Sequence, residues 1–495
     1  MTKILTATVS ALALASLAAP ALAQHHHTPG MQVPAPKQEP AAKKAAKRPA
    51  KRQQARETEI AAPVSQDHTQ HGAGMVPAVA ATPDSQHHGA DQPDMGGRDH
   101  DEHAGHAMSG ALGAYPMQRE SSGTAWQPDA SEHMGLMTTA GNWTLMAHGV
   151  INLVADHQSG PRGDKQLFPS GMLMGMARRP LGNGTLQLRA SLSPDPLMGK
   201  RGYALLLASG ETANGRDRLI DRQHPHDFFM ELSASVSQNI GPKSSVFLYA
   251  GLPGEPAFGP PAFMHREAIM DSPEAPISHH WLDSTHISFG VLTAGVARDR
   301  VKLEISRFNG REPDQHRWNV ETGALDSTAI RLSWNPTSEL SLQGSWGHFV
   351  DPEQLEPGVD QKRWSASLLY AREVAPGWKL AGTLAWGRKT IDHDGESLSD
   401  DAFVAEASAK HGPWTIFGRA EITENRELLA EVEHGPAFRV GKVSAGAVRD
   451  FRVTEHLSVG AGGLVSLNFV PDGLAPLYDG HNPIGAMGFL RFKLH

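Results

Sequence analysis

From Gly141 onward, apolar and polar residues alternate along the chain with a period of two. The stretch GTLQLRASLS, residues 184–193, places leucine and alanine on one side of an extended chain and glutamine, arginine and serine on the other. The stretches STAIRLSW (327–334) and ELSLQGSW (339–346) repeat this pattern. Such alternation predicts β-strands with one apolar and one polar face, in either a membrane barrel or a soluble sandwich.

The lengths of the connections distinguish between these two folds. Every second connection is a short turn and the others are long loops, which is typical of bacterial outer-membrane barrels. We therefore predict an all-β fold, an antiparallel outer-membrane β-barrel of about sixteen strands, with fourteen to eighteen as the range. The alternating stretches place the strands at about residues 142–155, 171–178, 185–193, 228–238, 245–252, 285–296, 300–307, 328–334, 340–348, 363–371, 378–388, 402–409, 414–422, 442–451, 457–469 and 485–494.

Aromatic residues and the last strand agree with a barrel. Tryptophans near the predicted strand ends match the aromatic girdles of such barrels: they are Trp143, Trp334, Trp346, Trp378, Trp386 and Trp414. The sequence ends on an alternating strand, GFLRFKLH, although it finishes with Leu494-His495 rather than the usual terminal aromatic residue. The polar strand faces carry serine, glutamine, glutamate and arginine, which predicts a polar lumen.

The first 135 residues have a different character. Residues 1–23 combine Lys3, an apolar stretch and the small-residue motif Ala21-Leu22-Ala23, which predicts a secretory signal peptide. Residues 24–135 contain little aromatic or β-branched material, which predicts a disordered, His/Met-rich extension in the periplasm. The barrel is expected to occupy residues 136–495. The chain has no cysteine, so Cys metal sites and disulfides are excluded, and its net charge of −8 does not indicate nucleic acid as a partner.

Histidine and methionine are interleaved in the predicted extension. Eleven of the 27 histidines lie between His25 and His133. The stretch RDHDEHAGHAMSG brings His100, His103, His106 and Met108 close together in sequence. Thioether favours Cu(I) and imidazole binds Cu(II), Zn or Ni, so the tract predicts metal binding, with copper as the favoured ion. The alternative is a solvated linker whose histidines have no ligand role.

Two of the long loops carry further candidate ligands. The stretch LIDRQHPHDFF contributes His224, His226 and Asp227 just before a predicted strand. The next long loop and the start of the strand after it add a larger set: His265, His279, His280, Asp283 and His286. These loops are neighbours around the predicted barrel. In sixteen-stranded porins the third loop folds into the lumen, and by analogy this loop is expected to bring its histidines towards His224 and His226.

Three interpretations of these loop residues stay open. They form a metal site or translocation filter in the barrel mouth, because His and Asp side chains ligate Cu or Zn. Alternatively, they form a structural polar network with lumen arginines such as Arg189 or Arg331. The third interpretation, a metal-dependent hydrolase centre, needs an open coordination position and a general base. No sustained helical period supports the parallel barrels on which such hydrolase motifs often lie, so we expect no enzymatic activity.

Several motifs resemble a known group of proteins. The stretches PLMGKRGYALLLASGET, GLPGEPAFGPPAFMHR and SPEAPISHHWLDSTHI, together with LIDRQHPHDFFMELSASVS and FNGREPDQHRWN, are similar to an uncharacterised proteobacterial outer-membrane β-barrel family. This family is often encoded with copper- and heavy-metal-resistance genes. The resemblance covers about residues 120 to 495 and implies an envelope location and a link to metal tolerance. The extension also resembles, in composition only, that of the outer-membrane copper-resistance protein B family.

The sequence thus predicts an outer-membrane barrel with a role in copper or heavy-metal binding or tolerance. A general porin-like channel with structural histidines and an outer-membrane hydrolase are the alternatives. The expected partners are outer-membrane lipid, the barrel-assembly machinery and metal ions, with a homotrimer by analogy to porins. Because a ligating imidazole must be neutral, metal binding is expected to weaken below about pH 6.

Overall fold

The computed structural model describes residues 108–132, 135–393, 396–430 and 435–495. Residues 1–107, which include the predicted signal peptide and His100, His103 and His106, lie outside this description, as do 133–134, 394–395 and 431–434. Among the described residues, no helix has both the length and the apolar character needed to span a membrane.

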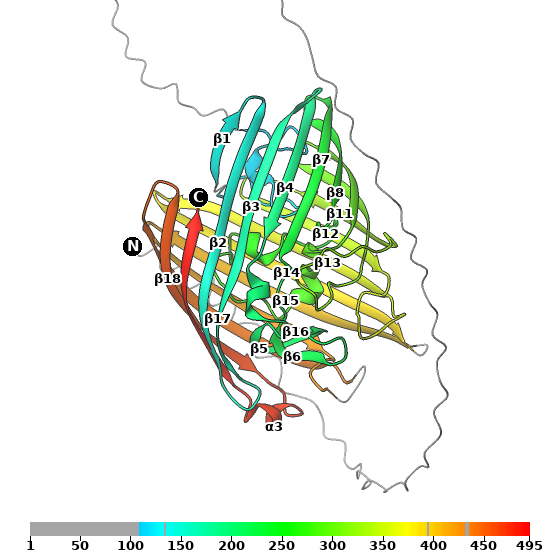
Figure 1. Cartoon of the computed structure of the whole chain (residues 1–495), viewed down its shortest axis with the longest axis vertical. Helices are drawn as coiled ribbons and strands as arrows, with labels where there is room; N and C mark the ends of the chain where they lie inside the picture. The colour runs from blue at the N-terminus through cyan, green and yellow to red at the C-terminus, as the bar shows by residue number, and fades with distance from the viewer. Residues whose placement is uncertain (1–107, 133–134, 394–395, 431–434) are drawn as a thin grey trace, which may run out of the picture. The chain divides into compact units, whose positions relative to one another are not determined.

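Sixteen antiparallel strands form a closed ring, which confirms the predicted barrel (Figure 1). The ring closes where β19 pairs with β2, from Leu494 opposite Gly149 to Gly485 opposite Gln158. The barrel strands are β2 (Trp143–Gln158), β3 (Lys165–Leu181), β4 (Gly184–Leu192), β7 (Phe229–Gly241), β8 (Ser244–Gly251), β9 (Val291–Arg298), β10 (Val301–Phe308), β11 (Ser327–Trp334), β12 (Leu340–Phe349), β13 (Gln361–Ala375), β14 (Trp378–His393), β15 (Glu396–His411), β16 (Trp414–Asn425), β17 (Phe438–Arg452), β18 (Leu457–Phe469) and β19 (Ile484–Leu494).

The remaining elements are short and are not among the sixteen strands of the ring. β1 (Leu136–Ala140) extends the edge of β2 beyond the end of β19. β5 (Tyr203–Thr212) and β6 (Arg218–Gln223) form a separate hairpin within the second long loop, which the alternation pattern did not predict. The helical turns are η1 (Met117–Arg119), η2 (Asp195–Met198), η3 (Phe263–His265), α2 (His279–Leu282), η4 (Ser284–His286) and α3 (Ala475–Tyr478).

One predicted strand begins later than expected. The alternation placed a strand at 285–296, but β9 begins at Val291 and the chain before it forms η4. Ile287 and Phe289 are 4% and 1% exposed in an interior apolar cluster rather than alternating along a strand. Gly290, with φ of 115°, then turns the backbone into β9 through a conformation that other residues rarely adopt.

The strand faces have the opposite polarity to those of a soluble protein. On β11, Arg331 and Ser333 are each 1% exposed, whereas Ile330 and Leu332 are 39% and 51% exposed on the outer face. The inward charges are paired: Glu304 Oε2 lies 3.1 Å from Arg331 Nε and 3.3 Å from Lys302 Nζ. A polar lumen, as predicted, is therefore enclosed by an apolar outer surface.

Residues 108–132, which we call the lumen plug, are folded inside the barrel at its short-turn end. Lumen side chains donate hydrogen bonds to its backbone: Arg189 Nη1 to Gly123 O at 2.7 Å, Ser245 Oγ to Leu112 O at 2.7 Å, and Asn335 Nδ2 to Gln127 O at 2.8 Å. The composition of residues 24–135 predicts a disordered extension, but residues 108–132 of this range are folded. The lumen plug is too polar to fold alone, but the polar lumen supplies the hydrogen bonds that its backbone needs.

Residues 253–290, which we call the inward loop, also fill the lumen, as the porin analogy predicts. Strand side chains fix it: Ser345 Oγ accepts a hydrogen bond from Gly259 N at 2.9 Å, and Glu421 Oε1 accepts one from Ser278 N at 3.0 Å. Arg266, with no exposed surface, binds Glu406 at 2.7 Å and Asp283 at 2.5 Å. These contacts hold α2 and η4, and the histidines they carry, in one place.

Candidate metal centre

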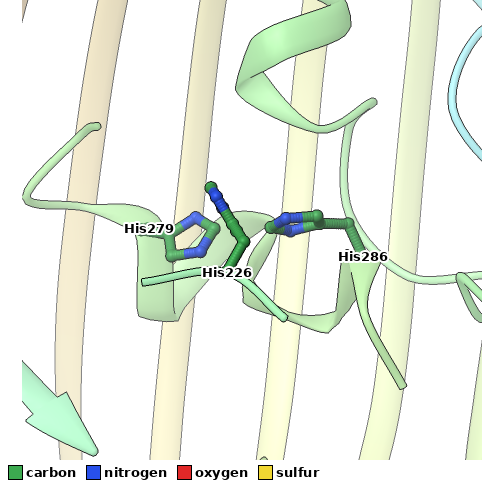
Figure 2. A group of neighbouring side chains, drawn as sticks. All are labelled: His226, His279 and His286. Carbon is green, nitrogen blue, oxygen red and sulfur yellow. The ribbon is translucent and has the colours of Figure 1, made fainter. Parts of the chain in front are cut away.

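Three histidines from two loops converge in the lumen (Figure 2). Each of His226, His279 and His286 offers a ring nitrogen, and these atoms lie within 4.8 Å of one another. His226 precedes β7, His279 begins α2 and His286 ends η4. Their exposed fractions are 6%, 1% and 8%, so water has little access to the rings. We call this group the three-histidine cluster.

The hydrogen bonds of the cluster fix which ring nitrogen is available. His226 Nδ1 lies 2.7 Å from Asp195 Oδ2, His279 Nδ1 lies 2.8 Å from Asp283 Oδ1, and His286 Nδ1 lies 2.7 Å from the backbone oxygen of Asp283. Carboxylates and carbonyls only accept, so each Nδ1 donates its proton and a neutral ring leaves the lone pair on Nε2. Metal-binding histidines are commonly held in this way by carboxylates or carbonyls.

The Nε2 atoms of all three rings lack any hydrogen-bond partner among the described residues. Buried polar atoms normally have a partner, and an orphaned one calls for an explanation such as an ion. A cation held among the three rings would supply the partner that these nitrogens lack. Three imidazole ligands leave a fourth position of a tetrahedral ion open, a donor set that suits Zn(II) or Cu(II).

Burial favours the neutral form of two of these rings, His279 and His286. Burial lowers the pKa of His279, and burial together with the neighbouring His226 and His279 rings lowers the pKa of His286 well below its ordinary value. Burial by itself would raise the pKa of Asp283, but Arg266 and His279 hold it below its usual range. Asp283 therefore remains a carboxylate that accepts from His279.

Other predicted ligands lie beside the cluster with partners of their own. His224 Nε2 is 3.1 Å from Glu211 Oε1, within ion-pair distance although it makes no hydrogen bond to a described residue. His280 Nδ1 is 3.0 Å from Glu312 Oε1. Burial opposes a charge on His280, but Glu312 overrides it and raises the pKa of His280 to about 9. A protonated imidazole has no lone pair for a metal.

The two predicted aspartates serve as partners of other side chains. Asp227, with no exposed surface, binds Arg317 at 3.1 Å, whereas Asp283 holds His279 and Arg266. The structural-network interpretation therefore describes His224, Asp227 and His280, while the metal-site interpretation describes the three-histidine cluster. Asp283 belongs to both, because it orients one of the cluster's rings and carries an ion pair.

Two further predicted ligands lie elsewhere. His265 faces a separate cavity near His148, with ring centroids 6.3 Å apart. Burial lowers the pKa of His265 to about 3. Met108 begins the lumen plug, where its backbone oxygen accepts a hydrogen bond from Met117 N at 2.9 Å.

Sequence reasoning missed Asp195, which orients His226. Asp195 is 4% exposed at the start of η2, 31 positions before its partner, and no local pattern links the two residues. The inward methionines of β3 were also missed, although the stretch GMLMGMARR places Met172, Met174 and Met176 at every second position. That spacing puts them on one strand face and was the available signal.

A glycine on β14 permits α2 to approach the barrel wall. A Cβ atom at Gly387 would lie 2.4 Å from the backbone oxygen of Trp281, so Gly387→Ala must displace α2 and with it His279. We expect about tenfold weaker metal binding, comparable to losing an orienting contact. The control is Gly344→Ala on β12, where an added Cβ meets nothing within 4 Å. Equal affinities for the two variants, measured by titration calorimetry, would show that α2 does not position a ligand.

Comparison with known proteins gives a likeness of fold. No family model matches the chain, and no curated protein matches its sequence. Solved structures that are similar include the outer-membrane expressed OmpT of Vibrio cholerae, with 8% identity and a TM-score of 0.42 over 72% of this chain and 100% of that chain. OmpF of Salmonella typhi in complex with daunomycin has 11% identity and a TM-score of 0.46 over 72% and 100% of the respective chains.

The anion-selective porin from Comamonas acidovorans has 11% identity and a TM-score of 0.41, over 71% of this chain and 100% of that chain. Likenesses at these identities and TM-scores carry no argument about function. The resemblance to a metal-resistance family stays a prediction, and the function of the protein is inferred from the chemistry of the site.

Proposed function

We propose that this protein is an outer-membrane barrel that binds copper, with the three-histidine cluster as its ordered site for Cu(II) and Zn(II) as the competing ion. The observation that carries this proposal is the set of three buried Nε2 atoms, each without a partner and each on a ring whose Nδ1 is held by an acceptor. Among divalent first-row ions, Cu(II) binds nitrogen ligands most strongly. The cluster would coordinate the copper ion, and the protein would thereby capture the metal or contribute to metal tolerance.

The outer surface of the barrel supports a membrane location. Leu303 and Ile305 on β10 are each 49% exposed, and Leu490 and Phe492 on β19 are 51% and 49% exposed. Outward residues of this kind recur around the barrel and would be unfavourable in water but suit a lipid bilayer. Outer-membrane lipid and the assembly machinery are accordingly proposed as partners, while the homotrimer stays a prediction.

The interior supports metal binding over general diffusion of solutes. The lumen plug fills the short-turn end, and the inward loop crosses the lumen with Arg266 and Asp283 fully buried. A wide aqueous pore would leave such groups in contact with water. Solute passage would therefore require these segments to move, whereas ion binding uses them where they lie.

The test of this proposal is metal retention by the full-length chain in detergent. The protein is loaded with Cu(II) or with Zn(II) and passed through gel filtration with a competing chelator, and the retained metal is measured. We expect the wild type to retain one ion per chain more than His286→Ala, in which the N-terminal tract is unchanged, with X-ray absorption showing three imidazole nitrogens around that ion. Complete loss of metal to the chelator, or a shell without several imidazoles, would refute the proposal.

Metal binding at this cluster should depend less on pH than binding by unstructured histidines. Free imidazole has a pKa of about 6.5, so at pH 5.5 each such ligand loses about tenfold in effective affinity to protons. Burial lowers the pKa values of His279 and His286, so protons compete with the metal for these two rings at lower pH than for free imidazole. Retention of metal at pH 7.5 and pH 5.5 measures this, and a peptide of residues 84–110 is the control. A matching loss in both would contradict a pre-formed site.

A further inference from the structure

Methionines gather around a cavity of about 90 Å³ at the short-turn end of the lumen. The cavity lies between the lumen plug, the inner faces of β2, β3 and β4, and the part of the inward loop that follows η3. Five of the 17 methionines in the chain line it: Met117, Met146, Met174, Met176 and Met270. We call it the methionine cavity.

The strand register brings three of these thioethers and an imidazole onto one face. Met146 on β2 stands opposite Met176 on β3, and His148 stands opposite Met174. Residues opposite each other on antiparallel strands have Cβ atoms about 5 Å apart, and alternate residues along one strand are about 7 Å apart. Met146 and Met174 are 6% and 5% exposed, so this face is directed into the lumen.

A second imidazole reaches the cavity from the inward loop. His265, at the end of η3, lines the cavity with its ring centroid 6.3 Å from that of His148. The donor set is therefore thioether and imidazole from three separate parts of the chain. Since the chain has no cysteine, methionine is its sole source of sulfur ligands.

Methionine also fills irregular gaps in apolar cores, which is the alternative explanation. A packing role predicts that the side chains close the space, but here a cavity the size of several water molecules remains. Its lining also includes charged side chains, which an apolar core would exclude: the carboxylates Glu120, Glu132 and Glu267 and the guanidinium groups of Arg178 and Arg189. The thioether and imidazole donors, rather than the charge of the lining, therefore favour a metal ion as the occupant.

We propose that the methionine cavity is a second metal site, for a soft monovalent cation of the Cu(I) class, with the cavity's thioethers and His265 as donors. Soft thioether ligands select Cu(I), whereas the three-histidine cluster suits divalent ions. The two sites therefore differ in the oxidation state of the copper ion that each would bind. This proposal rests on the cavity alone and stands or falls separately from the three-histidine cluster.

One helical turn joins the two sites. Phe263 packs on the cluster, with its ring centroid 5.7 Å from that of His279, while His265 lines the cavity. Between them, Met264 packs against an apolar group that includes Met172 and Met230. Thioethers are therefore also present beside the helical turn that carries Phe263 and His265.

Ag(I), a redox-inert probe for Cu(I), tests this proposal on the full-length chain in detergent. The variant Met146→Leu with Met174→Leu and Met176→Leu keeps side-chain volume nearly constant, so the barrel should still fold. We expect it to lose the tight Ag(I) equivalent seen in the wild type, and X-ray absorption to show fewer sulfur neighbours. Because the N-terminal tract is present in both proteins, its contribution cancels in the comparison.

The control is Met487→Leu, a buried methionine on β19 in a different apolar cluster, which should bind Ag(I) like the wild type. If the triple variant fails to fold by circular dichroism, Met174→Leu alone replaces it and should weaken Ag(I) binding. Unchanged Ag(I) affinity and stoichiometry in the folded variant would overturn the proposal. Retention of Cu(II) by the same variant reports separately on the three-histidine cluster.

Discussion

Replacing His286 by alanine should weaken Cu(II) or Zn(II) binding at the ordered site by more than about 100-fold. Loss of an orienting contact behind a ligand typically costs 10- to 100-fold in metal affinity, and removal of the ligand itself should exceed that range. His286 is one of three histidines whose ring nitrogens converge, and its ring centroid lies 5.1 Å from that of His226 and 5.2 Å from that of His279. Competition titration against a chelator of known affinity measures the change.

The matched control for that experiment is His316→Ala. His316 also pairs with a carboxylate, at 2.9 Å from Asp314, but its side chain is 57% exposed in a polar loop and lies outside the cluster. We expect wild-type affinity for this variant. Equal affinity of His286→Ala and the wild type would mean that the cluster is a structural feature, leaving the N-terminal tract as the source of any metal binding.

Replacing Arg266 by methionine should lower the free energy of unfolding by about 3–5 kcal/mol, the usual cost of removing one partner from a buried ion pair. Arg266 has no exposed surface and binds both oxygens of Glu406 as well as Asp283. Without it, Glu406 keeps only Arg419 as a cationic partner among the described residues. Asp283 then keeps its contact with His279. Methionine keeps much of the volume but none of the charge, so the variant isolates the electrostatic contribution.

Urea unfolding of the refolded barrel in detergent measures this loss. The control is Arg388→Met, because Arg388 also binds a carboxylate, Asp401 at 2.7 Å, with its side chain 45% exposed. An exposed pair contributes about 0–1 kcal/mol, so this variant should unfold close to the wild type. If both variants lost stability equally, burial of the Arg266 network would not be what fixes the inward loop.

The strand positions could be predicted because side chains along every strand of a barrel wall alternate between facing the lipid and facing the lumen. The inward loop was predicted by analogy, and His226, His279 and His286 were among the predicted ligands. Local sequence did not separate them from His224 and His280, because the choice depends on which ring faces Glu211, Glu312 or an open space. Those contacts are set by loops that meet only after the barrel closes.

The lumen plug could not be predicted from composition, since few of its residues would drive folding in water. Its stability depends on donors such as Arg189 and Asn335, which lie far away in sequence. Asp195 was missed for the same reason, because its partner His226 lies on the other side of a hairpin. The methionines of β3 were visible as an alternating pattern. The cavity that two of them line could not be predicted, because it also depends on side chains from β2 and η3.

The closing seam of the barrel has a consequence for how the chain folds. β2 and β19 are the first and last strands of the ring, so their pairing has the greatest sequence separation of any pair in the wall. Contacts between distant segments carry a large loop-closure cost and slow folding. Until these strands meet, each presents an open row of unpaired backbone groups, which is a template for aggregation. Closure of this seam is thus the step at which folding is slow and aggregation competes. A factor that keeps these two strand edges from pairing with other chains would increase the yield of folded barrel.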